Sequence, residues 1–453
     1  MRFSLLALIA LSVAAFAAQT PAAPRNPKAN VILITIDTLR ADHVGCYGVK
    51  QVQTPTIDSL GRDGVVYERA FSQVPLTWPS HAAILTGTYP FQNGVQDFTG
   101  QPLSPKFRTV AEAFKANGYA TGAVVSSFVL DRSWGLARGF DFYDDAFGKD
   151  LQSKDLGLVD RRADESVSHA IAWLEKSTLT KTSRPFFLWL HLYDPHSPYD
   201  PPEPYHTQYK DHLYDGEIAY ADHELGRLIA WLKAHRLYDR SAIVLLSDHG
   251  ESLGEHGEQE HGFFVYNATI HIPLIVKPPA GSDVRTGRSS EIVESTSAAP
   301  SLLKLTNVKD SIEKQFQSAT LPAVAAKLDK AAYSETFYPF SSFGWSPLHS
   351  LESDRYHYID APQPELYDVT ADPEEKNNLA SQQSAVVSVL KDKLQQQLKD
   401  NPFASASGAN ANLDPDAAAR LRALGYVAYH AQVSAEAIKA GLADPKAKIN
   451  EFN

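Results

Sequence analysis

The sequence predicts an α/β protein built on a large, mostly parallel central sheet with helices on both faces. Two apolar runs, Val31–Ile36 and Ala242–Leu246, are too short for amphipathic helices and have no internal polar alternation. Such runs are typical of strands buried on both faces. Helical and strand patterns alternate over most of the chain, which favours parallel strands joined through helices.

The remaining elements of the large unit follow the same alternation. Helices are predicted over Thr109–Asn117 and Asp164–Glu175, and strands follow them over Ala120–Ser126 and Pro185–His191. A longer helix is predicted over Gly216–His235, because its apolar residues recur on one helical face. These residues are Ile218, Leu225, Leu228, Ile229 and Leu232.

A smaller α+β unit with an antiparallel sheet is predicted after residue 308. A polar helix beyond Lys309 is followed by short strands around Ala332–Phe337 and Arg355–Asp360 and by a helix over Ser384–Leu398. The stretch Asn401–Asn412, rich in Ala, Ser, Asn and Gly, has the composition of a linker. We therefore expect a catalytic domain over residues 29–308, a smaller unit over 309–400, and a linker with a helical tail over 401–453.

The N-terminus has the pattern of a secretory signal peptide over residues 1–18, followed by a leader over 19–28. Arg2 precedes the apolar run Leu5–Phe16, and small residues predict cleavage near Ala17 or Ala18. Because a spanning helix needs roughly 20 apolar residues, we expect no stable membrane span after cleavage; a retained anchor is the alternative. The protein is thus expected in the periplasm or outside the cell.

Composition indicates a globular chain with room for one large core and a smaller domain. The 453 residues are 43% hydrophobic and 21% charged, which excludes a disordered chain. The formal net charge of -11 argues against nucleic-acid binding. The sixteen histidines, many of them between His191 and His271, invite a metal interpretation. Cys46 is the single cysteine, so an internal disulfide is excluded.

Two helical patterns, Ser434–Ala443 and Pro445–Phe452, end the sequence. They could open a helical-repeat extension beyond the C-terminus, since the first unit of a repeat array cannot bury its face alone. A frayed tail explains the same pattern.

Residues that carry chemistry follow the two buried strands. Asp37 comes directly after one strand, and Asp248-His249 come after the other. Because ligands gather at the carboxyl ends of strands in such sheets, both ends are expected to face one crevice. Thr77, on a loop entering a helix over Ser80–Leu85, would be a metal-activated nucleophile. The alternative for Thr77 is an N-cap bonded to the first helical turn.

Five ordered motifs make the sequence resemble the sulfatase family of the alkaline phosphatase superfamily. The resemblance implies an α/β sandwich with a large central sheet, a smaller C-terminal sheet, and hydrolysis of sulfate or phosphate esters at a bound divalent metal. The motifs are Ile36–Gly48 (IDTLRADHVGCYG), Pro79-Ser80-His81 with Leu85–Pro90, His191–Tyr199 (HLYDPHSPY), Asp248–Glu251 (DHGE), and Glu365–Asp368 (ELYD) with Asp372-Pro373.

The departures from the family pattern change the expected chemistry. Sulfatases have a cysteine or serine at the position of Thr77, which an enzyme oxidises to formylglycine; Thr77 cannot become that aldehyde, so no formylglycine is expected. His81 replaces the signature arginine, Thr38 replaces a second leading carboxylate, and Asp248-His249 replace an Asp-Asn pair. These changes resemble the Thr-nucleophile branches of the superfamily.

The predicted metal ligands are Asp37, Thr77, Asp248 and His249, a mixed O/N set that suits Zn or Mn better than Ca. The resemblance implies that His196 binds the ester group or protonates the leaving group, and it places His261 where many sulfatases have an ester-binding lysine.

Some superfamily members bind a second metal, which would here use Asp194, His196 and His261. One ion or two therefore remain open. The predicted substrate-binding residues are His81, Arg40, His191 and Trp345. Arg40 could instead pair with Asp42, and Trp345 belongs to an aromatic run that core packing also explains.

Three functions fit these residues. The first is an exported hydrolase of sulfate or phosphate esters, on a small molecule or a glycan, with Thr77 as nucleophile. The second is a phosphodiesterase or a transferase of phospho-headgroups. The third is a non-catalytic carbohydrate-binding relative, which the retained Asp37, Asp248 and His249 argue against.

Overall fold

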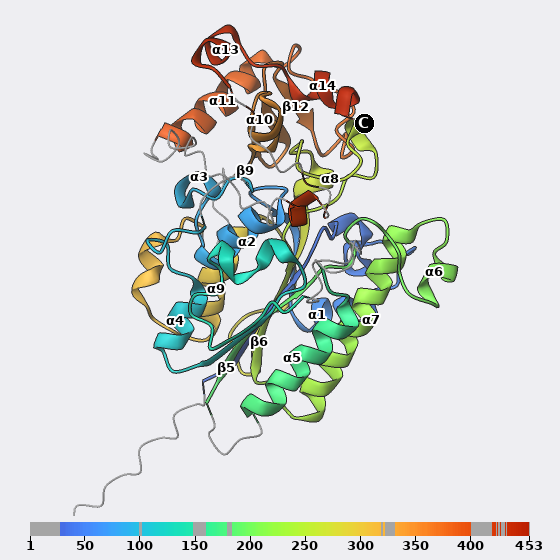
Figure 1. The fold of residues 1–453 in the computed structure, drawn as a ribbon, viewed down its shortest axis with the longest axis vertical. Helices are drawn as coiled ribbons and strands as arrows, with labels where there is room; N and C mark the ends of the chain where they lie inside the picture. The colour runs from blue at the N-terminus through green and yellow to red at the C-terminus, as the bar shows by residue number, and fades with distance from the viewer. Residues whose placement is uncertain are drawn as a thin grey trace, which may run out of the picture.

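The computed structural model describes residues 28–98, 102–147, 160–178, 184–318, 320–321, 331–399, 419–422, 424, 426, 431 and 433–452. The predicted signal peptide, nearly all of the leader and the predicted linker lie outside these residues. Figure 1 shows a large sheet flanked by helices, with a smaller unit at the top of the view. Within the described residues, no helix is both long and apolar enough to cross a membrane.

The large sheet has eight strands and is mostly parallel, as predicted. Only β7 runs antiparallel to its two neighbours, β6 and β2. In sheet order the strands are β4 (Phe142–Asp144), β3 (Ala120–Val124), β5 (Phe186–Leu192), β1 (Asn30–Ile36), β6 (Ser241–Ser247), β7 (His271–Lys277), β2 (Val65–Phe71) and β8 (Gly287–Glu294).

Helices cover both faces of this sheet (Figure 1). One face carries α1 (Pro55–Asp63), α5 (Ala163–Thr178) and α7 (Leu213–Ala234), and the other carries α2 (Thr77–Thr86), α4 (Val110–Ala116) and α9 (Ala298–Leu305). Strand β1 supplies both cores: Val31 and Leu33 pack into one, and Ile32 and Ile34 into the other. Burial on both faces is why this strand is apolar from Val31 to Ile34.

The smaller unit is an antiparallel sheet covered by a helix, as predicted. Its strands are β12 (Glu365–Asp368), β11 (Tyr356–Asp360), β10 (Leu348–Glu352) and β9 (Ala332–Thr336), and α11 (Ser384–Lys399) packs Leu390 and Leu394 against them. Short helices α3 (Pro90–Asn93), α6 (Tyr205–Gln208), α8 (Asn267–Ile270) and α10 (Tyr338–Phe343) connect the larger elements.

Three predictions about helices need correction. The long helix α7 begins at Leu213 rather than Gly216. The polar helix predicted beyond Lys309 is a five-residue 3-10 helix, Ser311–Gln315. The helix predicted over Ser80–Leu85 is α2, which already begins at Thr77. Pro79 is compatible with this start, since an amide in the first helical turn has no intrahelical acceptor to lose.

The C-terminal helices α13 (Ala435–Ala440) and α14 (Pro445–Phe452) do not support the predicted helical-repeat extension. Ile449 of α14 is buried in the core of the large unit, and the ring of Phe452 lies 4.7 Å from that of Phe263. Because α14 already has a packing partner, its apolar residues need no following repeat.

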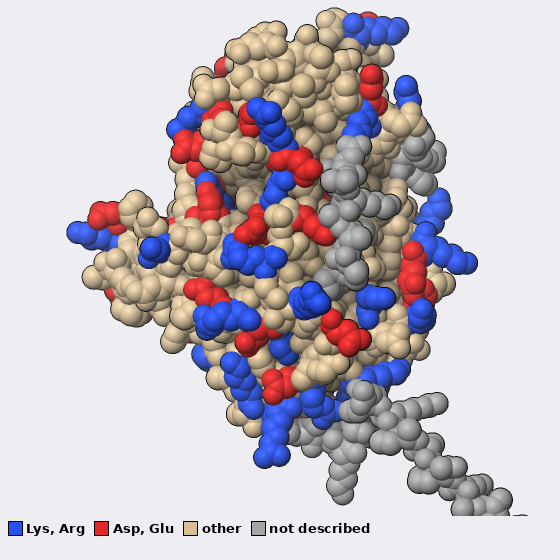
Figure 2. Space-filling view, turned by 180° about the vertical axis from the view of Figure 1, so that it is seen from behind, with Lys and Arg blue, Asp and Glu red and all other residues tan. Residues whose placement is uncertain are grey.

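Figure 2 shows Lys and Arg interspersed with Asp and Glu over one face of the molecule. Neither positively nor negatively charged side chains dominate that face.

Candidate active site

Adjacent parallel strands bring the two predicted acidic positions together. In β1 and β6, Ile36 is paired with Ser247, so the residues that follow, Asp37 and Asp248, leave the sheet side by side. The backbone N–H of Thr38 donates to Asp248 Oδ1 at 3.3 Å. Both carboxylates are completely buried. The sheet register alone therefore creates the acidic pair.

Thr77 lies at the start of α2 with its hydroxyl turned to this pair. Its Oγ1 is 3.4 Å from Asp37 Oδ1 and 3.3 Å from His249 Nε2. The N-cap position belongs to Leu76, and the first helical bond runs from the Ser80 N–H to the Leu76 carbonyl at 2.9 Å. The alternative interpretation of Thr77 as an N-cap is therefore wrong.

Asp37, Asp248 and His249 form a group that could hold a metal ion, because one ligand atom of each lies within 4.8 Å of the others. Nδ1 of His249 faces the Gly250 carbonyl at 2.9 Å and donates to it, so Nε2 offers its lone pair. Asp248 Oδ2 is buried without a hydrogen-bond partner. Burial, and then the charge of Asp37, raise the pKa of Asp248 well above its usual value. A bound cation would give Asp248 Oδ2 a partner and would offset the negative charge of the two buried carboxylates.

His191 and His81 lie beside this group, and one ligand atom of each also lies within 4.8 Å of one from Asp248. Nδ1 of His191 accepts from the Ser126 N–H, so Nε2 carries the proton and points at Asp37 Oδ2, 3.5 Å away. Nδ1 of His81 donates to the Thr77 carbonyl at 2.7 Å, and its Nε2 meets the Thr35 hydroxyl at 2.9 Å. Burial lowers the pKa of His81 to about 3, which keeps the ring neutral.

His196 and His261 border the site, and their rings differ in charge. Burial lowers the pKa of His196 to about 4, and its Nδ1 faces the Ser197 carbonyl. Burial also opposes charge on His261, but the Glu251 carboxylate, 2.9 Å from Nδ1, outweighs it and raises the pKa to about 9. At neutral pH His261 is therefore the cation and His196 the neutral base.

The structure does not bring together the three residues predicted to bind a second metal. Asp194, His196 and His261 are absent from the groups of described residues whose ligand atoms lie within 4.8 Å of one another. The physical reason is that Asp194 Oδ2 accepts from the Ala163 N–H at the start of α5. Burial raises the pKa of Asp194 to about 7.

Arg40 and Trp345 lie apart from Thr77. The guanidinium of Arg40 binds Asp42 at 2.8 Å and Glu255 at 2.7 Å, which is the ion-pair alternative considered for it. Trp345 stacks on Phe343 with ring centroids 4.6 Å apart, in an aromatic cluster at the smaller unit. Among the contacts of the described residues, these side chains are thus held by other partners than the acidic pair.

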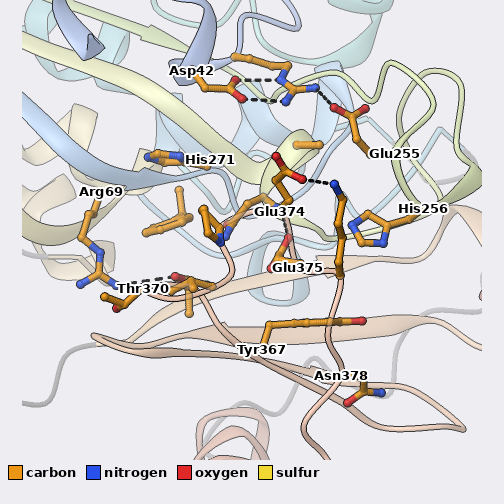
Figure 3. A pocket seen from close by; sticks show the side chains of 18 of the residues that line it. Asp42, Arg69, Glu255, His256, His271, Tyr367, Thr370, Glu374, Glu375 and Asn378 are labelled. Atoms are coloured by element: carbon orange, nitrogen blue, oxygen red, sulfur yellow. Dashed lines mark hydrogen bonds and ion pairs between the residues drawn. The ribbon is translucent and has the colours of Figure 1, made fainter. Parts of the chain in front are cut away.

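Arg40 lines a cavity of about 980 Å³ between the two sheets. Figure 3 shows its charged lining, with Asp42 and Glu255 at one end and Arg69 at another. None of the four predicted metal ligands lines this cavity. A smaller cavity of about 270 Å³, lined by His261, Tyr426 and Phe452 among others, adjoins the site instead.

Two contributors to the site were missed from the sequence. Glu251 was given no role of its own within the DHGE motif, but it is completely buried and bonded to His261. Its position directly after Asp248–Gly250 was the available signal. Tyr426, from the C-terminal segment, places its hydroxyl 3.4 Å from Thr77 Oγ1 and 3.1 Å from His261 Nε2. Its distance of 349 residues from Thr77 left no local signal.

The fold and the site define an α/β protein with a buried hydroxyl, an acidic pair and a cationic imidazole beside it. The model of the sulfatase family matches residues 29–308, and the C-terminal model of N-sulphoglucosamine sulphohydrolase matches residues 254–401. The chain belongs to the sulfatase family. Its enzymatic class is therefore that of a sulfuric ester hydrolase.

Individual relatives and solved structures agree with this family. An arylsulfatase of Clostridium perfringens is 22% identical over 78% of this chain and 90% of its own, and an ulvan-active sulfatase of Formosa agariphila is 27% identical over 78% and 77%. A phosphonate monoester hydrolase of Agrobacterium radiobacter has a TM-score of 0.69 at 20% identity, covering 82% of this chain and 96% of its own. BT4656, solved with its substrate D-glucosamine-2-N,6-O-disulfate, has a TM-score of 0.69 at 21% identity, covering 83% and 99%.

Proposed function

We propose that this protein is an exported, metal-dependent hydrolase of sulfate esters on glycans, with Thr77 as its nucleophile. The observation that carries the proposal is the position of the Thr77 hydroxyl, 3.4 Å from Asp37 and 3.3 Å from His249 in a fully buried site.

The divalent ion would be held by Asp37, Asp248, His249 and the Thr77 hydroxyl. When bound, it would lower the pKa of that hydroxyl and offset negative charge on the ester group. The mixed oxygen and nitrogen donors favour Zn or Mn over Ca. The His191 N–H directed at Asp37 would orient that carboxylate, in the way outer partners commonly orient metal ligands.

The residues of the chain suggest how the ester bond breaks. Thr77 Oγ1 forms a bond to sulfur while the bond from sulfur to the alcohol oxygen breaks, and the Thr77 proton passes to an Asp37 oxygen. The alcohol oxygen takes a proton from an acid. His261 suits that role better than His196, because its pKa of about 9 keeps it protonated at neutral pH.

The second step returns Thr77 to its free form. A threonine sulfate lacks the extra hydroxyl through which a formylglycine hydrate can eliminate sulfate, so water must attack the sulfur. The bond from sulfur to Oγ1 breaks, and Oγ1 takes back the proton that Asp37 received in the first step. The neutral His196, with a pKa of about 4, is available to take a proton from that water.

The substrate class rests on the relatives. The ulvan-active sulfatase and the structure with a disulfated glucosamine carry glycan names, and we extend that class to this chain. Export rests on the signal-peptide pattern of residues 1–18. Phosphoesters are the second candidate, because a threonine hydroxyl needs no oxidation and also serves phosphoryl transfer.

The test compares wild type, Thr77→Ala and Thr77→Ser on an aryl sulfate, an aryl phosphate monoester and an aryl phosphodiester. Thr77→Ala should lose at least about a thousandfold in kcat/KM on the preferred ester, as expected for loss of a nucleophile. Thr77→Ser is the matched control, since it keeps the hydroxyl. Full activity in Thr77→Ala would refute the assignment of the nucleophile, and a preference for the phosphodiester would replace the proposed substrate.

A further inference from the structure

Tyr426, a described residue of the C-terminal segment 419–426, reaches into the site. Its hydroxyl lies within hydrogen-bonding distance of Thr77 Oγ1, at 3.4 Å, and of His261 Nε2, at 3.1 Å. Its ring packs against Phe98 with centroids 4.2 Å apart. The side chain is therefore held from three sides by residues of the large unit.

Neighbouring residues anchor Tyr426 in this position. Leu421 and Leu424 are buried in the core that also contains α2. The Tyr426 N–H donates to the Leu421 carbonyl at 3.0 Å, and the Arg420 guanidinium lies 4.8 Å from the centre of the Phe128 ring. Apolar burial of this kind fixes the short helical turn at residues 419–422, and with it Tyr426, on the large unit.

Tyr426 also lies between the nucleophile and the adjoining cavity. Thr77 is fully buried, whereas Tyr426 and His261 line the cavity of about 270 Å³. The other close polar neighbours of Thr77 Oγ1 are Asp37 and His249, on the side of the acidic pair. An ester that enters from the cavity would thus meet the Tyr426 hydroxyl before it meets Thr77.

We propose that Tyr426 is a substrate-binding residue whose hydroxyl donates a hydrogen bond to the anionic group of the ester beside Thr77. Sulfate and phosphate oxygens only accept hydrogen bonds, and a tyrosine hydroxyl supplies a donor without adding charge. His261, at hydrogen-bonding distance from the same hydroxyl, brings a second donor to the same place. Tyr426 then belongs to the catalytic unit, although the sequence predicted a linker and tail for its part of the chain.

The proposal rests on the proposed function for its substrate, so the experiment separates the two. Wild type, Tyr426→Phe and Tyr426→Ala of the full chain, loaded with metal, are compared in kcat and KM on an aryl sulfate. Inhibition or binding by inorganic sulfate is measured in parallel. Tyr358→Phe is the matched control, because it removes a tyrosine hydroxyl bonded to Asp360 at 2.8 Å in the smaller unit.

Tyr426→Phe should lose about 10- to 100-fold in kcat/KM and in affinity for inorganic sulfate, as expected for a hydrogen bond to a charged group. Its melting temperature and that of Tyr358→Phe should stay close to wild type. Unchanged kinetics in Tyr426→Phe, or faster turnover in Tyr426→Ala, would overturn the proposal and leave Tyr426 as a cover over the site. If wild type cleaves no ester, the proposed function fails, and sulfate affinity alone decides the role of Tyr426.

Discussion

Replacing Glu335 by Gln should make the protein more stable, and increasingly so as the pH rises. Glu335 is completely buried in β9, where the smaller unit meets the large one. Its carboxyl accepts hydrogen bonds from Gln96 Nε2 at 2.8 Å and from the Tyr333 hydroxyl. Burial raises its pKa to about 7 from 4.5. A glutamine of the same shape has no carboxylate to ionise: its oxygen can accept from Gln96 Nε2, and its NH2 can donate to the Tyr333 hydroxyl, which then donates to His349 Nδ1, 2.9 Å away.

The sign follows from where the protons are bound. With its pKa raised by folding, Glu335 binds more protons in the native state than in the unfolded state between the two pKa values, so stability falls as the pH rises through this window. The loss is about 1 kcal/mol by about pH 5 and about 3 kcal/mol by about pH 8, from 1.36 kcal/mol for each unit. The glutamine variant avoids this loss.

The assay is thermal unfolding of wild type and Glu335→Gln at about pH 5 and about pH 8. The difference in melting temperature between the two proteins should grow by a few degrees towards the higher pH. Glu165→Gln, at an exposed position of α5, is the control and should show no such growth. An equal difference at both pH values would refute the reasoning, because it would mean that Glu335 ionises alike in both states.

Two further predictions concern the sheet and the metal. Gly122→Ala should destabilise the protein by about 1–3 kcal/mol, because an added methyl in β3 would overlap the Trp173 indole of α5; a melting temperature equal to wild type would contradict this. Chelation of divalent metal should abolish esterase activity and lower the melting temperature, because Asp37 and Asp248 then repel each other in a buried site. Zn or Mn should restore both better than Ca, and a chelated protein with full activity would contradict the metal assignment.

The parts of the fold with a strong local pattern are predictable. The strand runs Val31–Ile36 and Ala242–Leu246 appear within β1 and β6, since burial on both faces demands continuous apolar sequence. The side of the sheet beyond β6 is different, because its three strands, β7, β2 and β8, were not predicted. Strand β8, for example, is exposed or half-buried over its first five residues, Gly287–Glu291, so its sequence lacks the pattern of a buried strand.

The sequence by itself determined the candidate nucleophile and the acidic strand ends. Each of these residues is recognised from the sequence directly around it, and parallel strands of one sheet must bring their carboxyl ends to one edge. The tertiary structure decided the states of the histidines, because a ring nitrogen is a donor or an acceptor only through its partner, as the Ser126 N–H shows for His191. It also placed Tyr426 at Thr77. That contact joins residues 349 positions apart, and packing alone can create such a contact.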